Sequence, residues 1–137
     1  MYPTLELDYN KLLDMVSEMG YRLMKSGAEI YRVEESIQRL LQAYGAPRGE
    51  VFAIPNCLMV SLTSPDGRPV TQIRRMPTHG TDIYLLEKYN GLCRRLCRET
   101  PAFEEALEQM EAITRTHRVY SLPTQLAAPV SYTHLRA

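Results

Sequence analysis

The sequence carries no surplus of either charge and no long apolar run. Its sixteen acidic residues balance its sixteen basic residues, whereas a nucleic-acid-binding domain usually has a clustered basic excess. No segment approaches the roughly 18 consecutive apolar residues of a membrane-spanning helix. Residues 1–8 also lack the basic-then-apolar pattern of a signal peptide. We therefore expect a domain that is soluble and cytoplasmic in character and has no nucleic-acid partner.

Paired cysteines and common catalytic motifs are also missing. The chain has three cysteines, an odd number that suits a reducing compartment. Cys93 and Cys97 are one helical turn apart, but no CxxC or HxxxH completes a set of four metal ligands. The patterns GxGxxG, GxxxxGK[ST], GxSxG and HExxH do not occur. We therefore predict no metal, no cofactor and no enzymatic activity.

The length and composition of the chain are those of one globular domain. The chain has 137 residues, of which 45% are hydrophobic and 23% are charged. A chain of this length can bury roughly two-thirds of its unfolded surface, so it needs no disulfide or metal to hold its fold.

The hydrophobic period changes along the chain from helical to two and back to helical. Helices are expected over residues 8–25, with Asp8 as N-cap, and over 26–45. Strands follow over 50–54, 57–63 and 68–76, with a turn at 64–67. Two more helices start at Thr81 or Asp82 and at Thr100-Pro101, and Ile37 and Leu86 fall on apolar helix faces. The order of these helices and strands along the chain predicts an α+β domain with helices packed on one face of a small antiparallel sheet.

The most informative stretch begins at Ser26. Ser26 and Glu29 have the spacing of a capping box, in which the two side chains satisfy free N–H groups of the first helical turn. Gly27 suits a backbone with positive φ between two helices. On the helix that follows, Glu29 and Glu34 fall on opposite shoulders of the apolar stripe, and Arg32 points toward water.

Four segments, in this order, resemble the soluble N-terminal domain of the threonine/serine exporter (ThrE) family: SGAEIYRVEESIQRLLQAYG, EVFAIPNCLMVSL, TQIRRM and DIYLLEKYNGLCRRL. The resemblance covers about residues 9–120. It implies an exporter of small amino acids in the inner (plasma) membrane, with this domain on the cytoplasmic side. The membrane spans would lie in the same chain or in a partner subunit, and a two-subunit branch exports dicarboxylates instead.

The resemblance also suggests how the chain is divided. Residues 1–120 would form the cytoplasmic domain, and residues 121–129 would begin a linker toward a missing membrane domain. Residues 130–137 resemble the translation of a sequencing adapter, so they are expected to contribute neither to the fold nor to the site. The natural protein is then expected to continue, and this chain to be a fragment.

The candidate substrate or interface residues are Ser26, Gly27, Glu29, Arg32, Glu34 and Arg75. Glu29, Arg32 and Glu34 could contact the transport part or a polar solute. They could equally be a helix cap with an i,i+3 ion pair, which stabilises a helix by only about 0.2–0.5 kcal/mol. Arg74 and Arg75 should place one charge on each face of the sheet, where Arg75 could add to a basic surface that faces anionic lipid.

Two functions of different classes remain open at this stage. The first is the domain of an exporter, whose partners would be its membrane part and a small amino acid or dicarboxylate. The second is a free-standing ligand-binding module or enzyme that uses Glu29, Arg32 and Glu34. A homo-oligomer is left open in both. Under the first, Glu34→Ala should reduce export without unfolding the domain.

Overall fold

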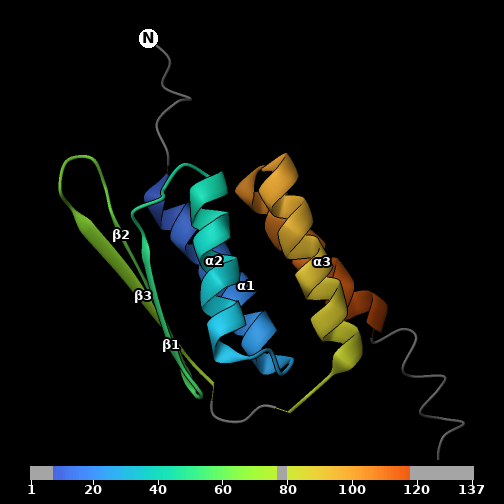
Figure 1. Cartoon of the computed structure of the whole chain (residues 1–137). Helices are drawn as coiled ribbons and strands as arrows, with labels where there is room; N and C mark the ends of the chain where they lie inside the picture. Colours follow the sequence, from blue (N-terminus) through green and yellow to red (C-terminus); the bar gives the residue numbers. More distant parts are fainter. Residues whose placement is uncertain (1–7, 77–79, 118–137) are drawn as a thin grey trace, which may run out of the picture.

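The computed structural model describes residues 8–76 and 80–117, and the predicted linker and tail lie outside them. The elements are α1 (Tyr9–Lys25), α2 (Ile30–Ala43), β1 (Glu50–Ile54), β2 (Cys57–Thr63), β3 (Pro69–Arg75), α3 (Ile83–Glu99) and a last helix over residues 103–117. They form an α+β fold in three layers (Figure 1). The sheet contacts α1 and α2, which separate it from α3 and the last helix. The predicted fold class is confirmed.

The sheet has the strand order β1-β2-β3, and both pairs are antiparallel. Leu58, Val60 and Leu62 of β2 are buried against the helices, as the alternation in the sequence predicts. The hairpin between β2 and β3 turns at Gly67, which has a φ of +85°. Arg74 points to the helical side and Arg75 to the exposed side, so the prediction of one charge on each face is also confirmed.

The core is centred where α1 and α2 cross over the sheet. A Cβ atom on Gly20 would lie 2.6 Å from Cδ2 of Leu58 and 3.4 Å from Ile37. The absence of a side chain at this position of α1 therefore lets α2 and β2 approach closely. Ile37 is fully buried, as predicted, whereas Leu86 is only partly buried against the core. The prediction that Leu86 is a core residue is therefore correct only in part.

The predicted capping box at Ser26 is wrong. Ser26 is the C-cap residue of α1 and is buried, while α2 begins only at Ile30, with Glu29 as an N-cap that makes no side-chain hydrogen bond. Gly27 does have the expected positive φ, at +103°. It packs so closely on Thr81 that a Cβ atom would lie 3.0 Å from the Thr81 Cα. The Gly27 N–H donates to the Met24 carbonyl and the Ala28 N–H to the Leu23 carbonyl, so the loop closes the end of α1 and also packs closely on the residue before the α3 cap.

The start of α3 is held by two hydrogen bonds. Asp82 is its N-cap, as predicted, and its Oδ1 accepts from the Leu85 N–H at 3.0 Å. The Asp82 N–H in turn donates to the Ser26 carbonyl at 2.9 Å. This contact fixes the end of α1 against the beginning of α3.

The last helix starts two residues later than predicted. Thr100 adopts a left-handed backbone conformation (φ +40°) that ends α3, and the helix begins at residue 103. The Pro101 carbonyl accepts a hydrogen bond from the Tyr44 hydroxyl at 2.7 Å, which ties the connection to the end of α2. Proline therefore precedes the helix here instead of forming its first turn.

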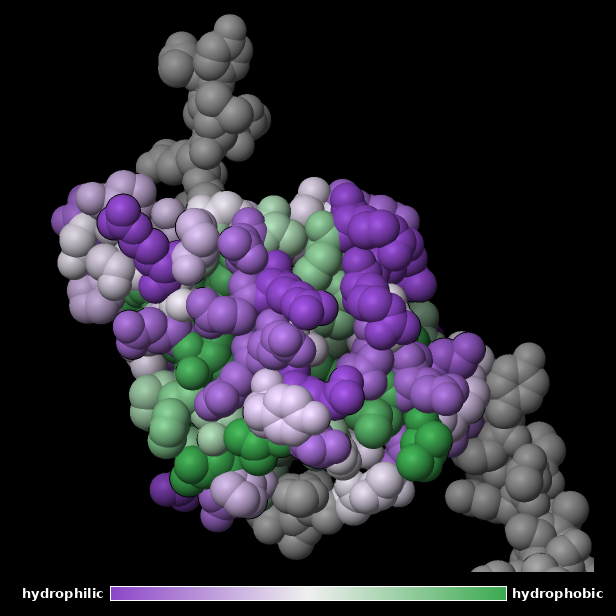
Figure 2. All heavy atoms as spheres, in the orientation of Figure 1, coloured by the Kyte–Doolittle hydropathy of each residue, from purple (hydrophilic) through white to green (hydrophobic). Residues whose placement is uncertain are grey.

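Hydrophilic residues cover much of the outer surfaces of α2 and α3 (Figure 2). Lys88, Arg94, Arg95 and Arg98 of α3 are all exposed, as the sequence predicts. Within the described ranges, no helix combines the length and the hydropathy needed to cross a bilayer.

Candidate functional site

A polar pocket of about 410 Å³ lies where α1 ends, α3 begins and the last helix passes. Its volume falls in the range of roughly 300–1,000 Å³ that is typical of small-molecule sites. We call it the Arg22 pocket. The described residues that line it are Glu18, Tyr21, Arg22, Lys25, Ser26, Gly80, Thr81, Asp82, Leu85, Tyr89, Glu111 and Thr114.

Arg22 of α1 is the central residue of this pocket. Its side chain is only 18% exposed, and its guanidinium donates hydrogen bonds to acceptors on three helices. The acceptors are Glu18 Oε2 (2.6 Å), Tyr89 Oη (2.9 Å), Thr114 Oγ1 (3.0 Å), the Met110 carbonyl (3.1 Å) and Glu111 Oε1 (2.9 Å). One side chain therefore joins α1, α3 and the last helix.

Glu18 extends this network to the sheet. Its Oε1 accepts from Arg74 of β3 at 2.9 Å, and the Arg74 guanidinium lies 4.2 Å from the centre of the Tyr21 ring. Burial by itself raises the pKa of Glu18, but the hydrogen bonds from Arg74 and Arg22 outweigh it and lower the pKa below its ordinary value. Burial likewise disfavours the charged form of Arg22, yet its bonds to Glu111, Glu18 and Tyr89 raise its pKa. Both groups are therefore charged at neutral pH.

The rim of the pocket offers groups of both charges to a ligand. The Lys25 ammonium lies 5.8 Å from the centre of the Tyr21 ring and has no ion pair within residues 8–76 and 80–117. The Asp82 carboxylate supplies the negative charge on the rim, and its Oδ2 lies 3.0 Å from Nε2 of His117. Ser26 and Thr81 add hydroxyl groups to the lining. Such a set can bind a small molecule that carries an ammonium, a carboxylate and a hydroxyl group.

Of the residues predicted from sequence, Ser26 lines the Arg22 pocket and Gly27 packs beside it on Thr81. Glu29 and Arg32 do not line it. Both are exposed, and the Arg32 guanidinium lies 5.7 Å from the centre of the Tyr31 ring. The i,i+3 ion pair between Glu29 and Arg32 is not formed in the described part of the chain.

Glu34 and Arg75 lie elsewhere. The Glu34 carboxylate accepts from the backbone N–H of Ala53 at 2.9 Å, which satisfies a donor on the edge strand β1. Glu34 therefore connects α2 to the sheet. Arg75 is exposed on the face of the sheet that no described helix covers. Of the predicted charged cluster, Glu34 is thus engaged by β1, while Glu29 and Arg32 remain exposed to solvent.

The sequence was compared with family models, known proteins and solved structures, and the first two comparisons point to the same family. A sequence model of the family described as "Putative threonine/serine exporter" (ThrE) matches residues 14–131. The chain belongs to this exporter family. A protein named "Probable threonine/serine exporter" from Mycobacterium tuberculosis is 28% identical over 116 residues, which cover 84% of this chain but 22% of that relative. The chain thus spans about a fifth of the relative's length. No solved structure matches it significantly.

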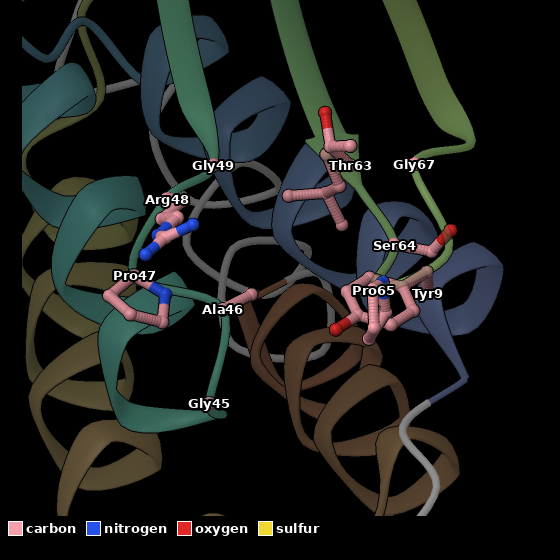
Figure 3. A pocket seen from close by; sticks show the side chains of 11 residues that line it. Tyr9, Gly45, Ala46, Pro47, Arg48, Gly49, Thr63, Ser64, Pro65 and Gly67 are labelled. Carbon is pink, nitrogen blue, oxygen red and sulfur yellow. The ribbon is translucent and has the colours of Figure 1, made fainter.

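A second and larger pocket, of about 560 Å³, lies at the opposite end of this ThrE-family chain (Figure 3). It separates the loop after α2 from the β2–β3 hairpin, and Tyr9 and Pro65 face Arg48 across it. Of the described residues that line it, Arg48 alone carries a charge. Its wall consists largely of glycine, proline and other loop backbone, so it offers fewer ligand-binding groups than the Arg22 pocket.

The cysteines of α3 behave as packed side chains. The Cys93 thiol donates to the Ser36 carbonyl at 3.8 Å. Interaction with Cys93 lowers the pKa of Cys97, while interaction with Cys97 and burial raise the pKa of Cys93. The described residues contain no group of three or more histidine, cysteine, aspartate or glutamate side chains that could hold a metal ion.

Sequence reasoning missed Arg22, Glu18, Tyr89 and Glu111. Tyr89 is part of an apolar stripe in the sequence, and Arg22 is separated from Tyr89 and Glu111 by 67 and 89 residues. The one local signal was the i,i+4 spacing of Glu18 and Arg22 beside the buried face of α1. Nothing local indicated that distant residues complete the network.

Proposed function

We propose that this chain is the cytoplasmic domain of a secondary transporter that exports small amino acids such as threonine and serine. The observation that carries the proposal is the family match over residues 14–131, together with a relative that is named as an exporter and of which this chain covers 22%. The spans would lie in the rest of the exporter chain or in a partner subunit of the inner (plasma) membrane. Residues 121–129 would lead toward them, and residues 130–137 would not belong to the natural protein.

The role proposed for the Arg22 pocket is to bind the transported amino acid on the cytoplasmic side. Lys25 can pair with the carboxylate of such a solute. The Asp82 carboxylate already accepts from the Leu85 N–H and contacts His117 Nε2, and its remaining lone pairs can accept from the ammonium group of the solute. The hydroxyls of Ser26 and Thr81 suit a solute that itself carries a hydroxyl group. Arg22 and Glu18 already neutralise one another, so they would shape the pocket while the groups on the rim contact the solute.

Addition of L-threonine or L-serine to the ¹⁵N-labelled chain should shift the amide NMR signals of Ser26, Thr81 and Asp82. Lys25→Ala should weaken binding by about tenfold, because it removes a charge-assisted contact with the carboxylate. Lys11→Ala is a matched control, since Lys11 lies in α1 but pairs with Glu104 away from the pocket. Unchanged spectra, or equal affinity in Lys25→Ala, would contradict this role. Shifts with a small dicarboxylate in place of the amino acids would favour the dicarboxylate branch of the family.

The exposed residues of the predicted signature would contact the membrane part. Arg32 lies on the solvent side of α2 and stacks on Tyr31, so its removal should not affect folding of the domain. Glu34→Ala is a less specific test of contact with the membrane part, because it would also leave the Ala53 N–H without its acceptor.

In cells that carry the intact exporter, Arg32→Ala should lower threonine export by at least about threefold, as expected for the loss of one interface contact, and leave the melting temperature of the domain unchanged. Arg39→Ala is the control, because Arg39 is exposed on the same helix and pairs only locally with Glu35. Equal export by wild type and Arg32→Ala would rule out this contact. Export of neither threonine nor serine by the wild-type protein would refute the proposed function itself.

The alternative of a free-standing module or enzyme built on Glu29, Arg32 and Glu34 is supported by no specific contact among the three side chains in the described part of the chain. Glu29 and Arg32 are exposed, whereas the Glu34 carboxylate accepts from the Ala53 N–H.

A further inference from the structure

The outer face of the sheet is an ordered grid of side chains that no described helix covers. The strand register places its residues in three rows across β1, β2 and β3. The first row is Glu50, Ser61 and Thr71, the second is Phe52, Met59 and Ile73, and the third is Ile54, Cys57 and Arg75. We call this grid the outer sheet face.

The centre of the outer sheet face is apolar and exposed. Phe52 is 57% exposed, Ile73 56%, Ile54 41% and Met59 36%. They form one contiguous group because the register makes each a neighbour of the next. Contiguous exposed apolar groups on a folded domain mark interaction surfaces, whereas single exposed hydrophobic residues do not.

The two charges of the outer sheet face lie at opposite corners. Glu50 begins β1 and Arg75 ends β3, so a diagonal between them passes over Met59. Both are exposed, and neither has an ion pair in the part of the chain that the structure describes. A surface with an apolar centre and opposite charges at opposite corners is complementary to a copy of itself.

We infer that the outer sheet face binds the same face of a second copy of this chain. A two-fold axis that runs between the two sheets, at right angles to the Glu50–Arg75 diagonal, places Glu50 of each copy over Arg75 of the other. Met59 then packs on its own counterpart. With strands about 4.8 Å apart and alternate residues about 7 Å apart, the strands of the two sheets cross at roughly 70°. This angle is closer to the near-perpendicular class of sheet packing, at about 90°, than to the aligned class, at about 30°.

The charges select this arrangement over the alternatives. If the axis instead ran along the strands, Arg75 would lie over Ile54 of the other copy, and a charge would be buried against an apolar side chain at a cost. In the crossed arrangement the ion pair is formed twice, once at each end of the interface. Specificity in such contacts commonly comes from paired charges at the rim of an apolar centre.

Analytical ultracentrifugation of the purified 137-residue chain tests this interface. We expect a reversible monomer–dimer equilibrium with a dissociation constant on the order of 100 µM, as suits a small interface. Ile73→Ser should raise this constant by about tenfold, because it removes buried apolar area at the centre. Ile83→Ser is the matched control, since Ile83 is 65% exposed at the start of α3 and lies off the sheet.

Charge exchange tests the crossed arrangement itself. Glu50→Arg and Arg75→Glu should each weaken the dimer by about tenfold, because each creates two repulsive pairs, and the double variant should restore wild-type affinity. The proposed surface would be wrong if Ile73→Ser left the dissociation constant unchanged and the double variant did not recover wild-type affinity. A chain that stays monomeric up to about 1 mM would also overturn it and would leave the face to another partner, such as the rest of the exporter. None of these outcomes depends on whether the protein exports threonine.

Discussion

Ile37→Ala is expected to lower the free energy of unfolding by about 2–5 kcal/mol. Ile37 is fully buried on α2, and its side chain lies over Gly20 of α1 beside Leu58 of β2. The substitution therefore removes atoms at the point where two helices and the sheet meet. Gly20 has no side chain that could fill the cavity, so the loss should lie in the upper half of this range. Urea unfolding monitored by circular dichroism measures it.

Leu86→Ala provides the comparison for Ile37→Ala. Leu86 is only partly buried at the edge of the core, so its truncation should cost less, about 1–2 kcal/mol. The two variants change side chains of the same size, and the difference between them reports burial. Equal losses in the two variants would show that the placement of α2 over the sheet is incorrect.

Arg22→Met is expected to destabilise the protein by about 2–4 kcal/mol, because it deletes a largely buried charge that joins three helices and leaves its acceptors without their donor. Methionine retains much of the apolar stem, so the loss reports mainly the guanidinium contacts. Glu111→Gln is the control, since Glu111 is half exposed and its ion pair should contribute no more than about 1 kcal/mol. A loss in Arg22→Met as small as that in Glu111→Gln would contradict the central role of Arg22.

The same variant should have a distinct pH dependence. The pKa of Glu18 is lowered in the folded protein from its ordinary value of 4.5, so its ion pairs stabilise the fold fully above that value. The stabilisation is lost as the pH falls through the lowered folded-state pKa. The stability difference between wild type and Arg22→Met should therefore be constant near neutral pH and shrink below about pH 4.5. A difference that does not change with pH would exclude Glu18 as a partner of Arg22.

Several features could be predicted from local sequence because local chemistry decides them. The alternation in β2, the Asp8 and Asp82 caps and the positive φ of Gly27 all depend on residues close together in the chain. The start of α2 is mispredicted because two local motifs compete for the same residues. Ser26 and Glu29 have the spacing of a capping box, but Ser26 and Gly27 instead close the end of α1. There the Gly27 N–H donates to the Met24 carbonyl and the Ala28 N–H to the Leu23 carbonyl, so α2 begins only at Ile30.

The sequence by itself determined the α+β class, the order of helices and strands, and the membership of an exporter family, because periodicity and motifs are properties of neighbouring residues. Only the tertiary structure decided where the polar chemistry lies. Arg22 meets Tyr89 and Glu111 across 67 and 89 residues, and the strand register alone sets Glu50 and Arg75 at opposite corners of one face. Contacts between distant segments depend on how the apolar faces of the helices and the sheet pack together, and they cannot be predicted from the sequence of any one segment.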